Sequence, residues 1–127
     1  MAVARTGFVT FDCADPRTLA EFWAAMLGGE IRFESATTVA VRTDWVWLAA
    51  MKVADYRPPT WPEADVPKQI HLDLSVSDLT AAVDEAERLG ATPAAFQPAP
   101  DLRRILLDPA GHPFCLTTQV PREALEG

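Results

Sequence analysis

The chain has 127 residues, of which 49% are hydrophobic and 23% charged, so its length and composition fit one globular domain with a packed core. Its formal net charge is −7 and its eleven basic residues are spread along the chain, which excludes a basic stripe for nucleic acid. Because no apolar run approaches the roughly 20 residues that cross a bilayer and the first residues lack the order of a signal peptide, we expect a cytoplasmic protein with no membrane partner.

The first predicted strand runs from Phe8 to Cys13, where apolar and polar side chains alternate. Asp15 and Pro16 then supply an N-cap and a proline at the first helical position, and a helix with an apolar stripe follows until Gly28 ends it. Three strand-like runs complete this half: Glu30 to Glu34, Val39 to Arg42 and Val46 to Val53.

The same order of signals returns downstream, at an offset of about 62 residues. An alternating run from His71 to Val76 predicts a strand, and Asp78 offers an N-cap to a helix that Gly90 ends. Three more strand-like runs follow: Pro93 to Phe96, Arg104 to Leu107 and Phe114 to Thr118. The sequence therefore predicts a duplicated unit.

One strand, one helix and three strands, repeated, predict an α+β protein rather than a doubly wound sheet or a sandwich. We expect a single domain over residues 1–127, with module one at about 6–54 and module two at about 68–119. The proline-rich connector at about 55–67 is expected to be extended or to form a loop near the site, and the last residues to form a short tail.

Three stretches resemble the vicinal oxygen chelate superfamily, and its glyoxalase-like and bleomycin-resistance-like members in particular. They are Asp12 to Pro16 with Phe22-Trp23 and Leu27-Gly28, then Pro67 to Leu74, then Asp108 to Leu116. The resemblance implies two tandem βαβββ modules that form a cupped, open, eight-stranded mixed sheet around a central cavity, and it implies a homodimer. It leaves the reaction open, because the superfamily includes isomerases, epimerases, dioxygenases, fosfomycin-modifying enzymes and non-catalytic drug-binding proteins.

In catalytic members the metal ligands are His, Gln or Glu on the first and last strand of each module. The resemblance places these positions at Phe8, His71, Ala50 or Met51, and Cys115. Of these, His71 alone is a usual ligand for the family's metals, and a single histidine cannot hold a catalytic ion. We therefore expect no metal and no other cofactor.

His71, Asp73 and Ser75 share one face of their strand, and Thr10 and Asp12 occupy the matching face in module one. This face is expected to line the cup, either as a ligand-contacting pocket or as a satisfied structural network. His71 is a candidate for proton transfer, with Asp73 to orient it, although ligand contact and a structural role remain alternatives.

The predicted catalytic residues are His71 and Asp73, and the predicted ligand-binding residues are Phe8, Thr10, Asp12, Trp47, Trp61, Arg104 and Cys115. Core or dimer packing is the alternative for the tryptophans, and an exposed ion pair is the alternative for Arg104. Cys13 and Cys115 lack the spacing of a zinc or redox motif, so buried thiols are expected. His112 is expected to be a turn residue.

Three functions remain in view. The first is a protein that binds a small organic molecule in the cavity without a conventional metal site. The second is a lyase or isomerase that uses His71 and Asp73 for proton transfer, with or without a metal. The third is an interaction module whose cavity is filled by side chains such as Phe8, Trp47 and Met51.

Overall fold

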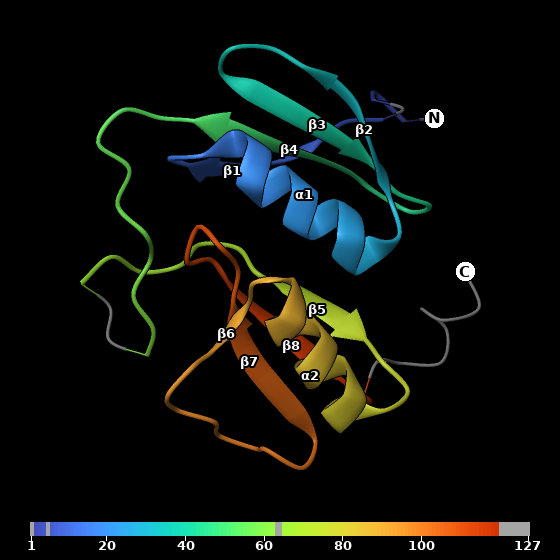
Figure 1. Ribbon diagram of the computed structural model, residues 1–127, viewed down its shortest axis with the longest axis vertical. Helices are drawn as coiled ribbons and strands as arrows, with labels where there is room; N and C mark the ends of the chain where they lie inside the picture. The colour runs from blue at the N-terminus through green and yellow to red at the C-terminus, as the bar shows by residue number, and fades with distance from the viewer. Residues whose placement is uncertain (1, 5, 63–64, 120–127) are drawn as a thin grey trace. The chain divides into compact units, whose positions relative to one another are not determined.

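The computed structural model of the protein describes residues 2–4, 6–62 and 65–119. The chain divides into two compact units, Met1–Tyr56 and Arg57–Gly127, and each contains one helix and one four-stranded sheet (Figure 1). The single-domain expectation stays a prediction. The predicted C-terminal tail lies outside the described residues.

The first unit is a β-α-β-β-β module. Its elements are β1 (Val9–Cys13), α1 (Pro16–Leu27), β2 (Glu30–Glu34), β3 (Thr38–Arg42) and β4 (Trp47–Lys52). The strand order in the sheet is β1-β4-β3-β2, in which β1 and β4 are parallel and the other pairs antiparallel.

The second unit repeats this order. Its elements are β5 (Leu72–Ser75), α2 (Leu79–Leu89), β6 (Thr92–Pro93), β7 (Arg103–Leu107) and β8 (Pro113–Thr117). The strand order is β5-β8-β7-β6, again with the first pair parallel and the others antiparallel. The predicted α+β class and the predicted repeat of β-α-β-β-β modules are confirmed.

The two helices begin where the sequence predicted. The Asp15 carboxylate accepts a hydrogen bond from the Thr18 amide at 3.2 Å, and the Asp78 carboxylate accepts one from the Ala81 amide at 3.0 Å. Each bond satisfies an amide that has no partner inside the helix. Gly28 and Gly90 end the helices with positive φ angles, as helix C-caps commonly do.

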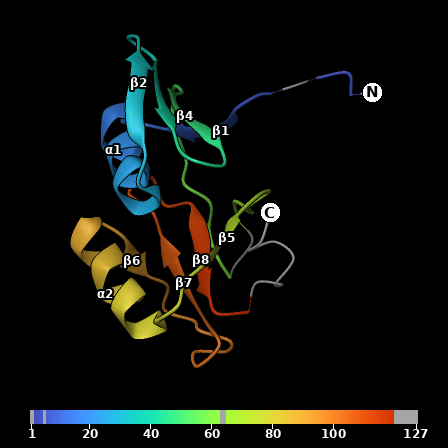
Figure 2. The same ribbon diagram turned by 90° about the vertical axis from the view of Figure 1, so that its right-hand side faces the viewer.

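Each helix covers one face of its own sheet (Figures 1 and 2). In the first unit, α1 buries Leu19, Phe22 and Trp23, and the Trp23 ring meets Phe11 of β1 edge to face at 5.8 Å. In the second unit, α2 packs on β7 and β8, where Leu106 and Leu116 are almost fully buried. We call the opposite side of the second sheet its open face.

The predicted strand from Pro93 to Phe96 is wrong, because β6 contains Thr92 and Pro93 alone. The Gln97 side chain takes over the pairing there: Nε2 donates to the Ala94 and Ile105 carbonyls, and Oε1 accepts from the Ile105 amide at 2.8 Å. The Gln97 side chain, together with the Ala94 amide that donates to the Ile105 carbonyl at 3.0 Å, thus satisfies the edge of β7 that a longer strand would have paired.

No helix among the described residues is long and apolar enough to span a membrane.

Candidate functional site

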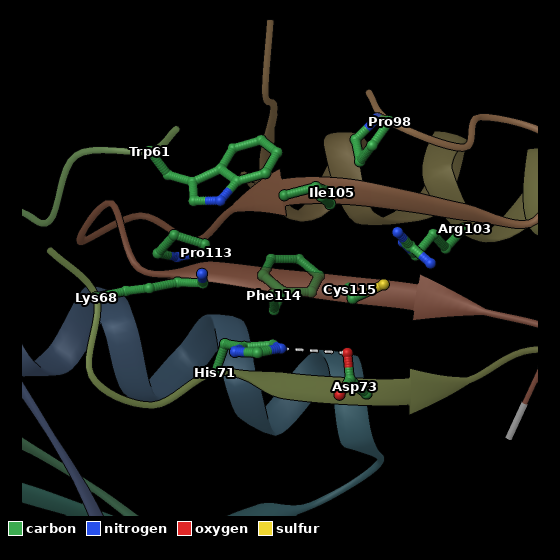
Figure 3. Close-up of a pocket in the computed structure, with 10 residues that line it drawn as sticks. All are labelled: Trp61, Lys68, His71, Asp73, Pro98, Arg103, Ile105, Pro113, Phe114 and Cys115. Atoms are coloured by element: carbon green, nitrogen blue, oxygen red, sulfur yellow. Dashed lines mark ion pairs between the residues drawn. The ribbon is translucent and has the colours of Figure 1, made fainter. Parts of the chain in front are cut away.

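A pocket of about 290 Å³ lies on the open face of the second unit, over β5, β8 and β7 (Figure 3). Its lining combines aromatic and apolar side chains with four titratable polar ones and a thiol. The lining residues are Trp61, Lys68, His71, Asp73, Pro98, Arg103, Ile105, Pro113, Phe114 and Cys115.

Strand register builds the floor of this pocket. Asp73 of β5 is paired with Cys115 of β8, which is paired in turn with Ile105 of β7, so three side chains form one row across the sheet. Residues two positions along a strand return to the same face, which adds His71 and Arg103 to the floor. Intervening residues such as Leu74 point to the other side and are buried there.

Trp61 forms the wall of the pocket and comes from the connector between the modules. Two hydrogen bonds join Thr60, which precedes Trp61, to Val66: the Thr60 amide donates to the Val66 carbonyl at 2.6 Å, and the Val66 amide donates to Thr60 Oγ1 at 3.0 Å. The indole packs against Phe96 with ring centroids 5.6 Å apart, and Lys68 Nζ lies 5.9 Å from its centre. The connector contains no helix or strand among its described residues, and it presents the face of the Trp61 indole to the pocket.

His71 and Asp73 stand together on the pocket floor. The Nε2 atom of His71 lies 3.5 Å from Asp73 Oδ1, and both side chains are substantially exposed, at 42% and 60%. This contact becomes an ion pair when the imidazole is protonated. The pair therefore faces solvent or a bound molecule and does not belong to a buried network.

Cys115 is 5% exposed and its thiol lies beside Asp73 and Arg103. Burial, with a smaller contribution from the Asp73 carboxylate, raises the pKa of the Cys115 thiol to about 11, although Arg103 opposes the shift. The thiol is thus protonated at neutral pH, which makes it a poor nucleophile and a poor metal ligand. The expectation that Cys13 and Cys115 are buried free thiols is confirmed.

The structure brings together four of the sequence-predicted site residues: Trp61, His71, Asp73 and Cys115. Arg104 is not part of this pocket. It pairs with Leu116 across β7 and β8 and lies on the face covered by α2, where its Nε atom is buried without a hydrogen-bond partner among the described residues. Its neighbour Arg103 lines the pocket instead, because adjacent residues on a strand face opposite ways.

Four other predicted residues belong to the first unit: Phe8, Thr10, Asp12 and Trp47. Phe8 is half exposed and its ring packs against Trp47 at 5.3 Å, while Thr10 and Asp12 lie on the face of β1 opposite α1. Their contribution to a ligand site remains a prediction. His112 lies in the turn before β8, as predicted, where its amide donates to Asp108 Oδ1.

The predicted site residues do not include Lys68, Arg103 and Ile105, which line the pocket. The signal that identifies Arg103 and Ile105 is strand parity: both are paired with the face of β8 that carries Cys115 and Thr117. Lys68 gave no comparable signal, because it lies in the connector, where no periodicity fixes the direction of a side chain.

The described residues do not fit the divalent ion that catalytic members of the superfamily that the chain resembles hold. Among residues 2–4, 6–62 and 65–119, no three His, Cys, Asp or Glu side chains are placed so as to hold a metal ion. The register also corrects the sequence mapping: Thr10 pairs with Ala49 as Asp73 pairs with Cys115, so Ala49, and not Ala50 or Met51, is the counterpart of Cys115. An alanine and a protonated thiol at these positions do not fit a hard divalent ion.

Duplicated β-α-β-β-β modules with a pocket on an open sheet face define a class of small α+β proteins. A glyoxalase-like domain family matches residues 8–117, and the chain belongs to this glyoxalase-like family within the vicinal oxygen chelate superfamily. No curated protein matches the sequence.

Several solved structures share the fold. The fosfomycin resistance protein FosX from Mesorhizobium loti is 15% identical, with a TM-score of 0.69 over 99% of this chain and 100% of that one. A bleomycin-binding protein from Streptomyces verticillus is 18% identical, with a TM-score of 0.58 over 94% and 100%. A glyoxalase/bleomycin resistance protein/dioxygenase family enzyme from Burkholderia phytofirmans is 15% identical, with a TM-score of 0.65 over 86% and 94%. At these identities the likeness establishes the fold alone.

Proposed function

We propose that this protein binds a small organic molecule in the pocket of its second unit, without a conventional metal site. The observation that supports this proposal best is the position of Trp61, which the Thr60–Val66 hydrogen bonds hold beside an open sheet face with polar groups on it. An aromatic wall with a few polar groups is typical of small-molecule sites. The related fold of a bleomycin-binding protein is consistent with such a use.

Ligand screening by thermal shift tests the proposal, because any compound that prefers the folded state raises the melting temperature. Hits are then titrated by calorimetry against wild type, Trp61→Ala and Trp45→Ala. Trp45 is 63% exposed, belongs to the first unit and does not line the pocket, so it controls for the loss of an indole. We expect Trp61→Ala to weaken binding by about tenfold, since aromatic contacts contribute roughly 0.5–1.5 kcal/mol beyond their area. Equal effects of the two substitutions would refute a site at Trp61.

A second candidate function is a lyase or isomerase in which His71 transfers a proton and Asp73 orients it. The 3.5 Å contact between Nε2 and Oδ1 favours it, since a base oriented by a carboxylate is a common catalytic arrangement. The decisive comparison is turnover by wild type and His71→Gln on compounds that bind. Metal analysis of protein purified without chelator belongs to the same experiment, and a stoichiometric metal would contradict the metal-free proposal.

The family resemblance also supports a homodimer as a proposal, and the cytoplasmic location expected from the sequence stays a proposal too. Sedimentation equilibrium over a range of concentrations would measure the oligomeric state directly. A monomer at all concentrations would reject the dimer and leave the pocket of the second unit unaffected, because all its lining residues come from one chain.

A further inference from the structure

The charge of the pocket is opposite to the charge of the protein. The chain as a whole has 18 acidic and 11 basic residues. The pocket lining has two permanent cations, Lys68 and Arg103, a histidine and one carboxylate, Asp73. Cations thus outnumber carboxylates in the described lining, and a concave surface with an excess of one sign of charge concentrates ligands of the opposite sign.

The two cations have no carboxylate partner among the residues that the structure describes. Within the described part of the chain, neither Lys68 nor Arg103 has an ion pair, whereas Arg17, Arg32 and Arg88 each contact a glutamate. Asp73, the one carboxylate among the described lining residues, contacts His71 instead. Among the described residues, no carboxylate pairs with either cation of the pocket, so we take their charge to be available to a ligand.

Between these cations the lining combines apolar side chains with the His71–Asp73 pair of the pocket floor. Figure 3 shows Lys68 and Arg103 toward opposite ends of the pocket, with the Trp61 indole and the Ile105 side chain between them. Pro98 and Pro113 add rigid apolar surface. A planar ring packed against Trp61 would therefore place a substituent at its edge within reach of one cation or the other.

We propose that the ligand is a small flat organic anion, with its ring against Trp61 and Ile105 and its acidic group bound by Lys68 or Arg103. This inference rests on the proposed function, because it names the chemical class of the molecule bound in the same pocket. Hydrogen bonds between a cation and a carboxylate are stronger than neutral ones, so an acid is selected over its uncharged analogue.

Matched acids and amides test the inference: benzoate with benzamide, and 1-naphthoate with 1-naphthamide, each titrated by calorimetry at low salt. We expect the acids to bind at least about fivefold more tightly than the amides, and this preference to shrink as salt is added. The variants Lys68→Gln and Arg103→Gln identify the end that holds the acid. Arg88→Gln is the control, because it removes the same charge from an exposed ion pair on α2.

Loss of the acid preference in Lys68→Gln, in Arg103→Gln or in the double variant, with Arg88→Gln unchanged, supports the inference. Equal binding of acids and amides by wild type would overturn it but leave the proposed function standing. If neither these pairs nor a broad panel of neutral compounds binds, the inference and the proposed function both fall.

Discussion

The imidazole of His71 lies 3.5 Å from the Asp73 carboxylate on the open face of the second sheet, whereas Leu74 on the other face of β5 is buried. Because both side chains are substantially exposed, their contact adds little to stability. We expect His71→Ala and Asp73→Asn each to lower the free energy of unfolding by less than about 1 kcal/mol, as exposed ion pairs do. Urea denaturation measures this. A loss above about 2 kcal/mol would show that the pair is structural and would remove the main argument for a functional role.

The loop that carries Trp61 provides the second prediction. Thr60 Oγ1 accepts a hydrogen bond from the Val66 amide, so Thr60→Val removes the acceptor while keeping the shape of the side chain. We expect this variant to weaken ligand binding by about fivefold, since the indole loses part of its support. Thr60→Ser keeps the hydroxyl and should bind as wild type does. Calorimetry with a compound found by screening measures both, and indistinguishable affinities would show that the loop is held by other contacts.

The repeated order of elements could be predicted from the sequence because its signals are local. Alternation identifies β1 and β5, and Asp15 and Asp78 identify the helix starts as N-caps. Short edge strands were less predictable, because the pairing near β6 depends on Gln97, whose side-chain partners are set by tertiary structure.

Part of the site could be predicted because strand alternation is also a local signal. His71, Asp73 and Cys115 follow from the alternation of strands whose buried faces are recognisable. The choice between Arg103 and Arg104 needs the register of β7 against β8, which a run of two arginines does not specify. Lys68 lies in the connector, where the direction of a side chain depends on loop closure.

The turn before β8 supplies a third prediction. Gly111 has a φ of +88°, and a Cβ atom there would lie 2.8 Å from the Cβ atom of Pro58. Gly28 also has a positive φ, of +67°, but its Cβ position is open. We therefore expect Gly28→Ala to cost about 1 kcal/mol from backbone strain alone, and Gly111→Ala to cost about 2–3 kcal/mol, because crowding adds to the strain. Equal losses in urea denaturation would mean that Pro58 moves aside freely.

Gln97 carries the fourth prediction. Its amide group bonds to the Ile105 amide and carbonyl and to the Ala94 carbonyl, so Gln97→Leu leaves backbone groups beside β7 without partners. We expect a loss of about 2 kcal/mol, within the range for an unsatisfied backbone group. The control is Gln119→Leu, since Gln119 is exposed and should change stability by less than about 0.5 kcal/mol. Similar stabilities of the two variants would show that water replaces the Gln97 bonds.

The last prediction concerns the Cys115 thiol, which is surrounded by the buried sheet, Asp73 and Arg103. Its pKa is raised to about 11 from an ordinary value of 9.0, chiefly by burial. The folded protein therefore holds this proton more tightly than the unfolded chain does. Stability from the protonated thiol is fully present below pH 9, and it is lost as the pH rises from about 9 toward about 11, because the unfolded chain gains by losing the proton first.

Two measurements follow from this shift. At pH 8, alkylation of Cys115 by iodoacetamide should be about a hundredfold slower than that of an exposed cysteine, because the thiolate is the reactive form. In thermal unfolding, the decline of stability above pH 9 should be shallower for Cys115→Ala than for wild type, since the variant lacks the group that titrates. Ionisable groups that the two proteins share contribute to both curves, so they cancel in this comparison. Parallel declines, or rapid alkylation of the folded protein, would mean that the thiol is accessible and that the pocket floor opens in solution.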